Sequence, residues 1–187
     1  IEGLIALMGG QEKFIGRLDS LFIAESKIEG PLVSSDISGL IGQYAHGNEP
    51  SHHIVHLYNY VNQSWKTQQL IDTILHTQYF NNPNGLSGNE DCGQMSAWYV
   101  LNAIGFYQVC PGSPIYSVGR PIFDKVTINL PNGKVFEIIA NNNSRTNKYI
   151  QSIRLDNILL ESPFFMHSDI MKGGKIVMEM GNTPVKQ

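Results

Sequence analysis

The hydrophobic pattern changes its period at Gly105, and this change constrains the fold more than any other feature of the sequence. Before Gly105, apolar residues recur at i, i+3, i+4 and i+7, which is typical of helices that bury one face. After Gly105, apolar and polar residues alternate, which is typical of β-strands. Helices followed by strands predict an α+β fold. Because prolines and glycines gather over 105–121, we expect a helical part over 1–110 and an antiparallel β part over 111–187.

The same spacings predict individual elements. We expect helices over 1–9, 37–46 and 65–79, and one that ends near residue 104 with Gly105 as its C-terminal cap. A hairpin is predicted over 126–140, with its turn at 131–133, and further strands over 149–155 and 175–180.

Composition excludes some classes of partner. The 187 residues are 42% hydrophobic and only 16% charged, with a net charge of -3. Without a basic stripe to neutralise phosphates, nucleic acid is not expected as the main partner. No apolar run approaches the roughly 20 residues of a membrane span.

Because the chain starts at Ile1, already inside a helical pattern, we expect it to be a piece of a longer or processed protein.

An acidic loop leads into a buried helix over 86–99 and contains Asn89-Glu90-Asp91. The positive end of a helix favours ionised carboxylates, so Asp91 is suited to act as a base or a cation ligand. The alternative is structural, with Asp91 as the N-terminal cap and Glu90 solvated. Residue type alone favours the cap, but glycines on both sides and an aromatic helix behind the loop favour a site.

A second polar segment, Asn48-Glu49-Pro50-Ser51-His52-His53, also precedes a predicted helix start. Glu49 is therefore expected to be ionised, which makes it a better metal or hydroxyl ligand than a proton donor. Capping is again the structural alternative.

Four histidines near this segment, namely His46, His52, His53 and His56, suggest a zinc site as a further hypothesis. Against it, the chain has no His-Glu-x-x-His motif and no paired cysteines that would supply further ligands.

Cys92 and Cys110 lie at opposite ends of a predicted helix, so a disulfide between them is possible but not favoured.

Taken in order, these motifs resemble glycoside hydrolase family 92, the calcium-dependent exo-acting α-mannosidases. The resemblance rests on the runs 47–53 and 83–99, then on Gly105-Phe106-Tyr107, Asn132-Gly133-Lys134 and Gly173-Gly174. It implies a β-sandwich followed by an (α/α)6 barrel. Our chain would carry the last barrel helices and the C-terminal antiparallel strands, and the earlier parts would be missing.

The resemblance also implies a chemistry. The family inverts configuration, and inverting enzymes use two carboxyl groups roughly 6.5–9.5 Å apart, one as acid and one as base. The base corresponds to Asp91, flanked by Glu90 as a second catalytic candidate. Asn48 and Glu49 are expected near the Ca²⁺ ion. We expect Asn89, His52 and His53 to contact the substrate, and the general acid to lie before residue 1.

The leading hypothesis is therefore the C-terminal catalytic part of a secreted or periplasmic enzyme that hydrolyses terminal α-mannosides of mannan or N-glycans. Its partners would be the glycan and the missing N-terminal part of the same protein. The alternatives are a carbohydrate-binding or structural fragment without activity, and a zinc hydrolase that uses the histidine cluster.

Overall fold

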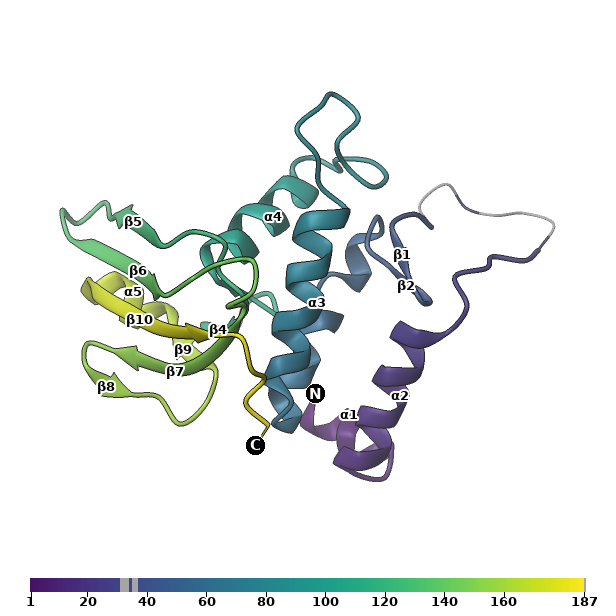
Figure 1. Cartoon of the computed structure of the whole chain (residues 1–187), viewed down its shortest axis with the longest axis horizontal. Coiled ribbons are helices and arrows are strands. Elements are labelled where there is room, and N and C mark those ends of the chain that lie inside the picture. The colour runs from purple at the N-terminus through teal and green to yellow at the C-terminus, as the bar shows by residue number, and fades with distance from the viewer. Residues whose placement is uncertain (31–33, 35–36, 187) are drawn as a thin grey trace.

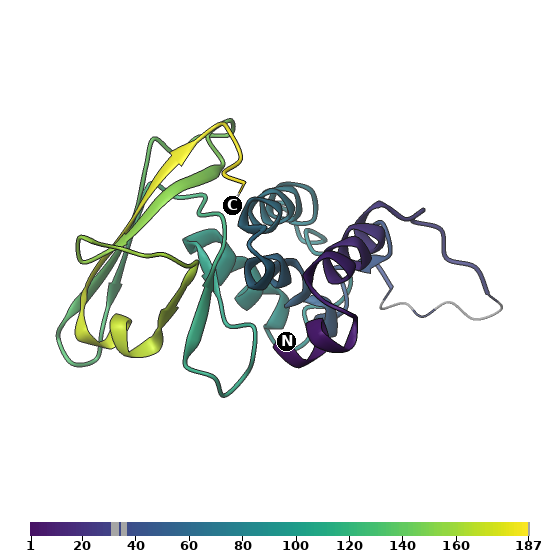
Figure 2. The ribbon, with the colours of Figure 1, turned by 90° about the horizontal axis from the view of Figure 1, so that it is seen from below.

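The computed structural model describes residues 1–30, 34 and 37–186. Figure 2 shows three layers in succession: the C-terminal strands, a central group of helices, and a pair of N-terminal helices. The N-terminal pair is α1 (Glu2–Leu7) and α2 (Gln11–Ile23). The central group contains the 3-10 helices η1 (Glu49–Ser51) and η2 (Ile54–Val61), with α3 (Ser64–Thr77) and α4 (Gln94–Ile104). The predicted combination of helices followed by strands is confirmed.

The central helices agree closely with the sequence pattern. α3 and α4 fall where helices were expected over 65–79 and up to residue 104. α4 ends at Gly105, which adopts a left-handed conformation with φ 113° and donates its amide to the carbonyls of Leu101 and Asn102. Glycine adopts this conformation without the penalty of a Cβ atom, so the predicted C-terminal cap is confirmed.

The helix expected over 37–46 is wrong. This segment forms a short antiparallel hairpin of β1 (Leu40–Ile41) and β2 (Tyr44–Ala45). Its turn lies directly on the end of α2, because Gln43 donates its amide to the carbonyl of Leu21 at 2.8 Å. Gly42 has φ 62°, and a Cβ there would lie 2.3 Å from the same carbonyl. The close approach to α2 therefore overrides the helical spacing.

The C-terminal strands form two sheets. The larger has the order β5-β6-β10-β7-β8 and contains the predicted hairpin, β5 (Lys125–Asn129) and β6 (Val135–Asn141). The other members are β7 (Tyr149–Leu155), β8 (Ile158–Leu159) and β10 (Gly174–Gly181). The smaller sheet joins β3 (Phe106–Tyr107), β4 (Ile115–Val118) and β9 (Phe164–Met166) in that order.

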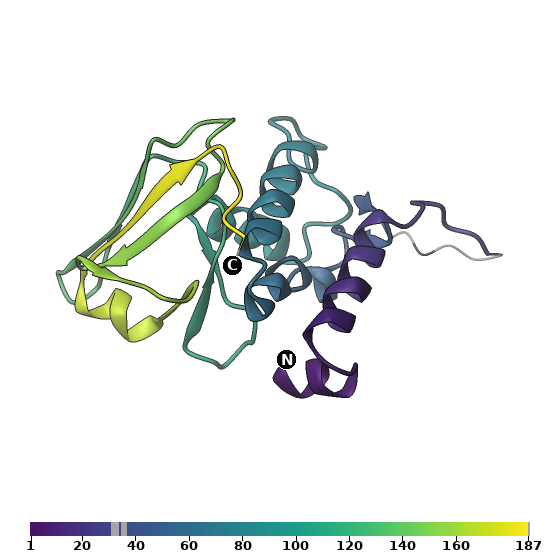
Figure 3. The same cartoon turned by 60° about the horizontal axis from the view of Figure 1, so that its bottom comes forward.

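One pairing departs from the antiparallel arrangement that the sequence predicted. β10 pairs with β7 in the antiparallel sense but with β6 in the parallel sense, with Ile176 opposite Ile138. α5 (His167–Lys172), the yellow-green helix in Figure 3, connects β9 to β10. This crossover places β10 in the middle of the sheet, between β6 and β7. The alternation of side chains predicts a strand but not its direction, so the sequence pattern could not predict the parallel pairing.

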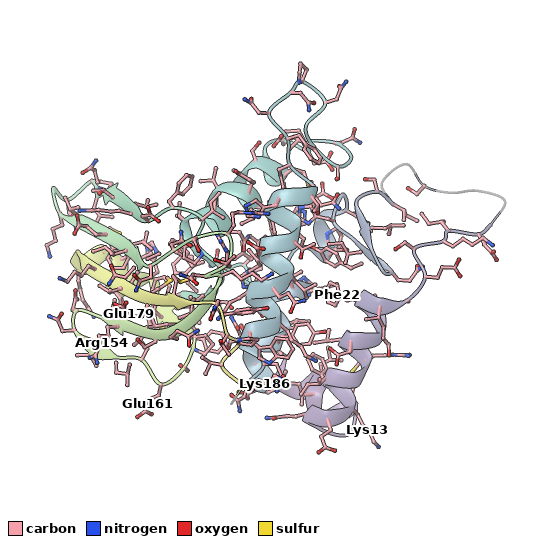
Figure 4. The ribbon with its side chains drawn as sticks, viewed as in Figure 1. Lys13, Phe22, Arg154, Glu161, Glu179 and Lys186 are labelled. Atoms are coloured by element: carbon pink, nitrogen blue, oxygen red, sulfur yellow. The ribbon has the colours of Figure 1, made fainter. Side chains whose placement is uncertain are left out.

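α4 lies between two hydrophobic cores. Trp98 packs on the helical side with Val55, Ile71 and Ile74, whereas Leu101 and Ile104 pack against the core of the sheet. On the outer side, Phe22 of α2 lies between α2 and α3 (Figure 4), with its ring centroid 5.2 Å from that of Tyr44. β3 and β4 pair across residue 110, so both sides of the expected 110/111 boundary contribute to one small sheet.

A buried ion cluster also fastens the helices to the strands. Asp72 of α3 lies 3.1 Å from Nε of Arg120 and 3.5 Å from Nζ of Lys148, two residues of the β part. Arg120 further donates to the carbonyls of Pro121 and Ser144.

Candidate active site

Two polar segments that are far apart in the sequence cross in direct contact at Gly47 and Gly88. A Cβ atom on Gly88 would lie 3.0 Å from the carbonyl oxygen of Gly47 and 2.9 Å from Oγ of Ser38. A Cβ atom on Gly47 would lie 2.9 Å from the carbonyl oxygen of Ser87. Only glycines allow this approach, and the next residues along the two segments are Asn48-Glu49 and Asn89-Glu90-Asp91. The crossing therefore brings both sets of carboxylates to one place.

The loop between α3 and α4, at the top of Figure 1, then enters an unusual turn before α4. Asp91, Cys92 and Gly93 follow one another with φ values of 49°, 56° and 93°. For a residue with a Cβ atom, the left-handed conformation costs about 1–2 kcal/mol. Two such residues in succession concentrate strain at Asp91, as is common where a site requires a particular geometry.

Glu90, and not Asp91, caps α4. The carboxylate of Glu90 accepts the amide of Ser96 at 3.0 Å and the Ser96 hydroxyl at 2.9 Å. Its carbonyl accepts the amide of Met95. Residue 93 at the N-cap position is glycine and has no side chain to offer. The side-chain cap that the structural alternative gave to Asp91 is thus supplied by Glu90, while the carbonyl of Asp91 accepts the amide of Gln94. The exposed Asp91 side chain makes another contact.

That contact is with Glu49. A hydrogen bond with the Asp91 side chain is the largest cause that lowers the pKa of Glu49 below its ordinary value, followed by a backbone hydrogen bond. Two carboxyl groups that bond directly must share a proton, or a cation must take its place. A low pKa is also the opposite of what a general acid requires, because an acid must remain protonated near neutral pH.

The pair satisfies the chemistry of a calcium site in part. Calcium is a hard cation that takes six to eight oxygen ligands, including carboxylates and amide carbonyls. Glu49 and Asp91 offer carboxylates, and Asn48 and Asn89 lie beside them in sequence. Within residues 1–30, 34 and 37–186, no three His, Cys, Asp or Glu side chains gather as a metal cluster. A calcium ion here would therefore need neutral oxygens as well.

The histidines do not form the zinc cluster that the sequence suggested. Each of three buried rings uses both nitrogens within the protein. His46 bonds to the hydroxyls of Tyr44 and Tyr79, and His56 to Asn102 and Ser117. His52 bonds to the carbonyl of His46 and to Gln94. No ring nitrogen of these three is left to bind a metal ion.

His52, expected as a substrate contact, is only 1% exposed. Both ring nitrogens of His52 are hydrogen-bonded within the protein, so His52 is placed to support the site and not to contact a substrate. His53 is partly exposed. Burial lowers the pKa of both rings. The supporting residues Tyr79 and Gln94 were missed, because nothing in their sequence neighbourhood indicates a contact with a histidine more than 30 residues away.

Two further observations concern the chain as a whole. Cys92 and Cys110 are both free and exposed. None of the helices in the described part of the chain combines the length and the apolar character that a membrane crossing requires.

Comparison with known proteins places the chain in a family. The model described as the Glycosyl hydrolase family 92 catalytic domain matches residues 1–182. The chain belongs to glycoside hydrolase family 92, as the resemblance of its motifs predicted.

Solved structures of the family superpose on the chain. A family GH92 α-mannosidase from Bacteroides thetaiotaomicron is 43% identical and covers 95% of this chain, with a TM-score of 0.86. The same enzyme in complex with mannoimidazole gives a TM-score of 0.89. A family GH92 inverting mannosidase from the same bacterium is 39% identical and covers 98% of this chain, with a TM-score of 0.83.

A curated relative is more distant. An uncharacterized secreted glycosidase of Arthroderma benhamiae is 27% identical over 181 residues, which is 95% of this chain and 21% of that protein. The two bacterial structures are covered to 23% and 26% of their length. The chain thus spans about a quarter of the length of these relatives.

Proposed function

We propose that this chain supplies the base and part of the calcium site of an inverting α-mannosidase that removes terminal mannose from glycans. The observation that carries the proposal is the contact between the side chains of Glu49 and Asp91 at the crossing of two loops. Two relatives of known structure are named as mannosidases, one of them as inverting, and both are about 40% identical to this chain.

Asp91 is the residue that we assign as the general base. Its side chain is exposed and contacts Glu49. With Ca²⁺ in place of the proton that the two groups share, the Asp91 carboxylate would be ionised and able to remove a proton from a water molecule. In an inverting hydrolase this water attacks the sugar from the face opposite the leaving group. Glu90 is assigned to a supporting role, because its carboxylate is held by Ser96.

Glu49 and Asp91, with Asn48 and Asn89 as neutral oxygen donors, are the residues that would hold Ca²⁺. A bound calcium ion would offer a hard, positive centre for the hydroxyl groups of the sugar. His53 and Asn89 are the partly or fully exposed side chains at this place and remain the proposed substrate contacts.

The general acid is assigned to a part of the protein outside residues 1–187. The lowered pKa of Glu49 supports this assignment, because it makes Glu49 a poor proton donor. We further propose that the helices before residue 110 are the last helices of an (α/α)6 barrel. A secreted or periplasmic location is proposed from the description of the Arthroderma benhamiae relative.

The decisive experiment compares two neighbouring carboxylates in the full-length protein. Asp91→Asn should lower kcat for an aryl α-mannoside by about 10²–10⁴-fold, the usual contribution of a general base. Glu90→Gln, which keeps an oxygen to accept from Ser96, should lower kcat by less than about tenfold. Turnover that survives Asp91→Asn would remove this residue from the role of base.

A metal titration tests the second part of the proposal. Removal of divalent cations with a chelator should abolish activity, and Ca²⁺ should restore it. Calorimetry should detect one calcium ion bound per wild-type chain and weaker binding by Glu49→Gln. Stoichiometric zinc in the purified protein, together with activity that calcium does not restore, would contradict the calcium site.

A further inference from the structure

A fully buried histidine immediately precedes Gly47, where the two segments cross. His46 is 0% exposed, and its ring lies among aromatic side chains, with its centroid 4.4 Å from that of Trp98. Its Nδ1 atom is 2.9 Å from the hydroxyl of Tyr44, and its Nε2 atom is 2.7 Å from the hydroxyl of Tyr79. The Tyr79 hydroxyl is in turn 3.2 Å from the carbonyl oxygen of Met95.

The direction of each hydrogen bond in this chain can be assigned. A carbonyl oxygen only accepts, so the Tyr79 hydroxyl donates to Met95. The Tyr79 oxygen must then accept from Nε2–H of His46, which makes Nδ1 the acceptor for the Tyr44 hydroxyl. Burial lowers the pKa of His46 to about 3, so the ring is neutral, as this arrangement requires. All three bonds point the same way, and such chains reinforce one another.

This chain of bonds, which runs from Tyr44 through His46 and Tyr79 to Met95, joins the two segments that carry the carboxylates. His46 is immediately before Gly47 and three residues before Glu49. Met95 is the second residue of α4, and its amide donates to the carbonyl of Glu90. The chain therefore joins the Glu49 segment to the turn that contains Asp91.

A second set of bonds fixes the backbone of the same segment. His52 donates from Nε2 to the carbonyl of His46, and its own carbonyl accepts Nε1–H of Trp98. The side chain of Gln94, the first residue of α4, donates to Nδ1 of His52. The side chain of His46 is thus held against the first turn of α4 through Tyr79, and its carbonyl through His52.

We propose that His46 is a positioning residue for the active site, which acts through Tyr79 and Met95 to keep Glu49 and Asp91 in contact. This inference rests on the proposed function, because it concerns the geometry of the proposed base and cation ligand. His46 does not touch the substrate. Its role resembles that of residues that hydrogen-bond to metal ligands and so orient them. Loss of such a residue typically costs 10–100-fold in metal affinity or activity.

The test removes single hydroxyl groups from the full-length protein. Tyr79→Phe keeps the aromatic ring but breaks the middle of the chain, so kcat should fall by about 10–100-fold and the calcium dissociation constant should rise by a similar factor. Tyr99→Phe is the matched control, because Tyr99 packs against the ring of Tyr79 at 4.8 Å but takes no part in the chain of bonds. Its kinetic constants and calcium affinity should equal those of the wild type.

Substitution of the histidine itself separates positioning from packing. His46→Gln retains a donor that can reach Tyr79 and should recover most of the activity, whereas His46→Phe fills the space without a donor and should not. Melting temperatures of both variants are recorded in parallel. The inference is overturned if Tyr79→Phe and His46→Phe lower the melting temperature but leave kcat and calcium affinity of the folded protein unchanged.

Failure of the underlying function would look different. A wild-type protein that neither hydrolyses α-mannosides nor binds calcium would overturn the proposed function, and this inference with it. A wild-type protein that does both, with Tyr79→Phe indistinguishable from it, would overturn the positioning role alone.

Discussion

Gly47→Ala tests the crossing that assembles the site, and its effect can be worked out from the structure. Gly47 is buried, and an added Cβ would lie 2.0 Å from Oγ of Ser38 and 2.9 Å from the carbonyl oxygen of Ser87. The serine hydroxyl can rotate away, but the carbonyl belongs to the backbone. Since ordinary contacts begin at 3.4 Å, the loop that carries Asp91 must retreat by about 0.5 Å.

This displacement has a cost in stability and in activity. Overpacking a close contact costs about 1–3 kcal/mol in the free energy of unfolding. A 1 Å misplacement of reacting groups costs about 10²-fold in rate, so half of that distance should lower kcat by about tenfold. Steady-state kinetics on an aryl α-mannoside and a thermal melt of the same preparation measure the two effects.

A matched substitution and a double variant make the prediction specific. Gly16 lies in α2 with nothing within 4 Å of an added Cβ, so Gly16→Ala should stabilise the protein by about 0.5–1 kcal/mol without changing kcat. Ser38→Ala added to Gly47→Ala removes the hydroxyl but not the clash with Ser87, and should not restore activity. A Gly47→Ala protein with wild-type kcat and melting temperature would refute the close crossing.

Two further predictions concern buried ionisable groups. Asp72→Asn leaves the Arg120 guanidinium, whose side chain is only 3% exposed, without its anion and should destabilise the protein by about 3–5 kcal/mol in a urea titration. Asp169→Asn, opposite an exposed lysine, should cost less than about 1 kcal/mol in the same titration. Equal losses would contradict the buried cluster. Burial lowers the pKa of His46 to about 3 and that of His56 to about 4, so the neutral rings stabilise the fold fully above pH about 6.5, and this contribution is lost as the pH falls toward 4. The melting temperature should drop markedly over that range, and a flat profile from pH 7 to pH 4 would show that the two rings are not buried as described.

The sequence by itself determined the elements whose patterns are local. The spacing of apolar residues predicted α3, α4 and the β5–β6 hairpin, and Gly105 marked the end of α4, because these features depend on interactions within a few residues. The motifs at 47–53 and 83–99, together with shorter ones after residue 104, predicted the family that the comparison shows. They also named Asp91 and Glu49 as the residues of interest.

Only the tertiary structure decided how these residues divide their roles. Glu90 and Asp91 are equivalent in sequence, and it is the left-handed turn that directs one to the helix cap and the other to Glu49. The direction of β10, the hairpin at residues 40–45 and the bonds of His46 to Tyr79 depend on contacts between segments far apart in the chain. The period of the apolar residues and the propensity of each residue depend on its neighbours in the sequence. A site is formed by segments that are far apart in the sequence and that folding brings together.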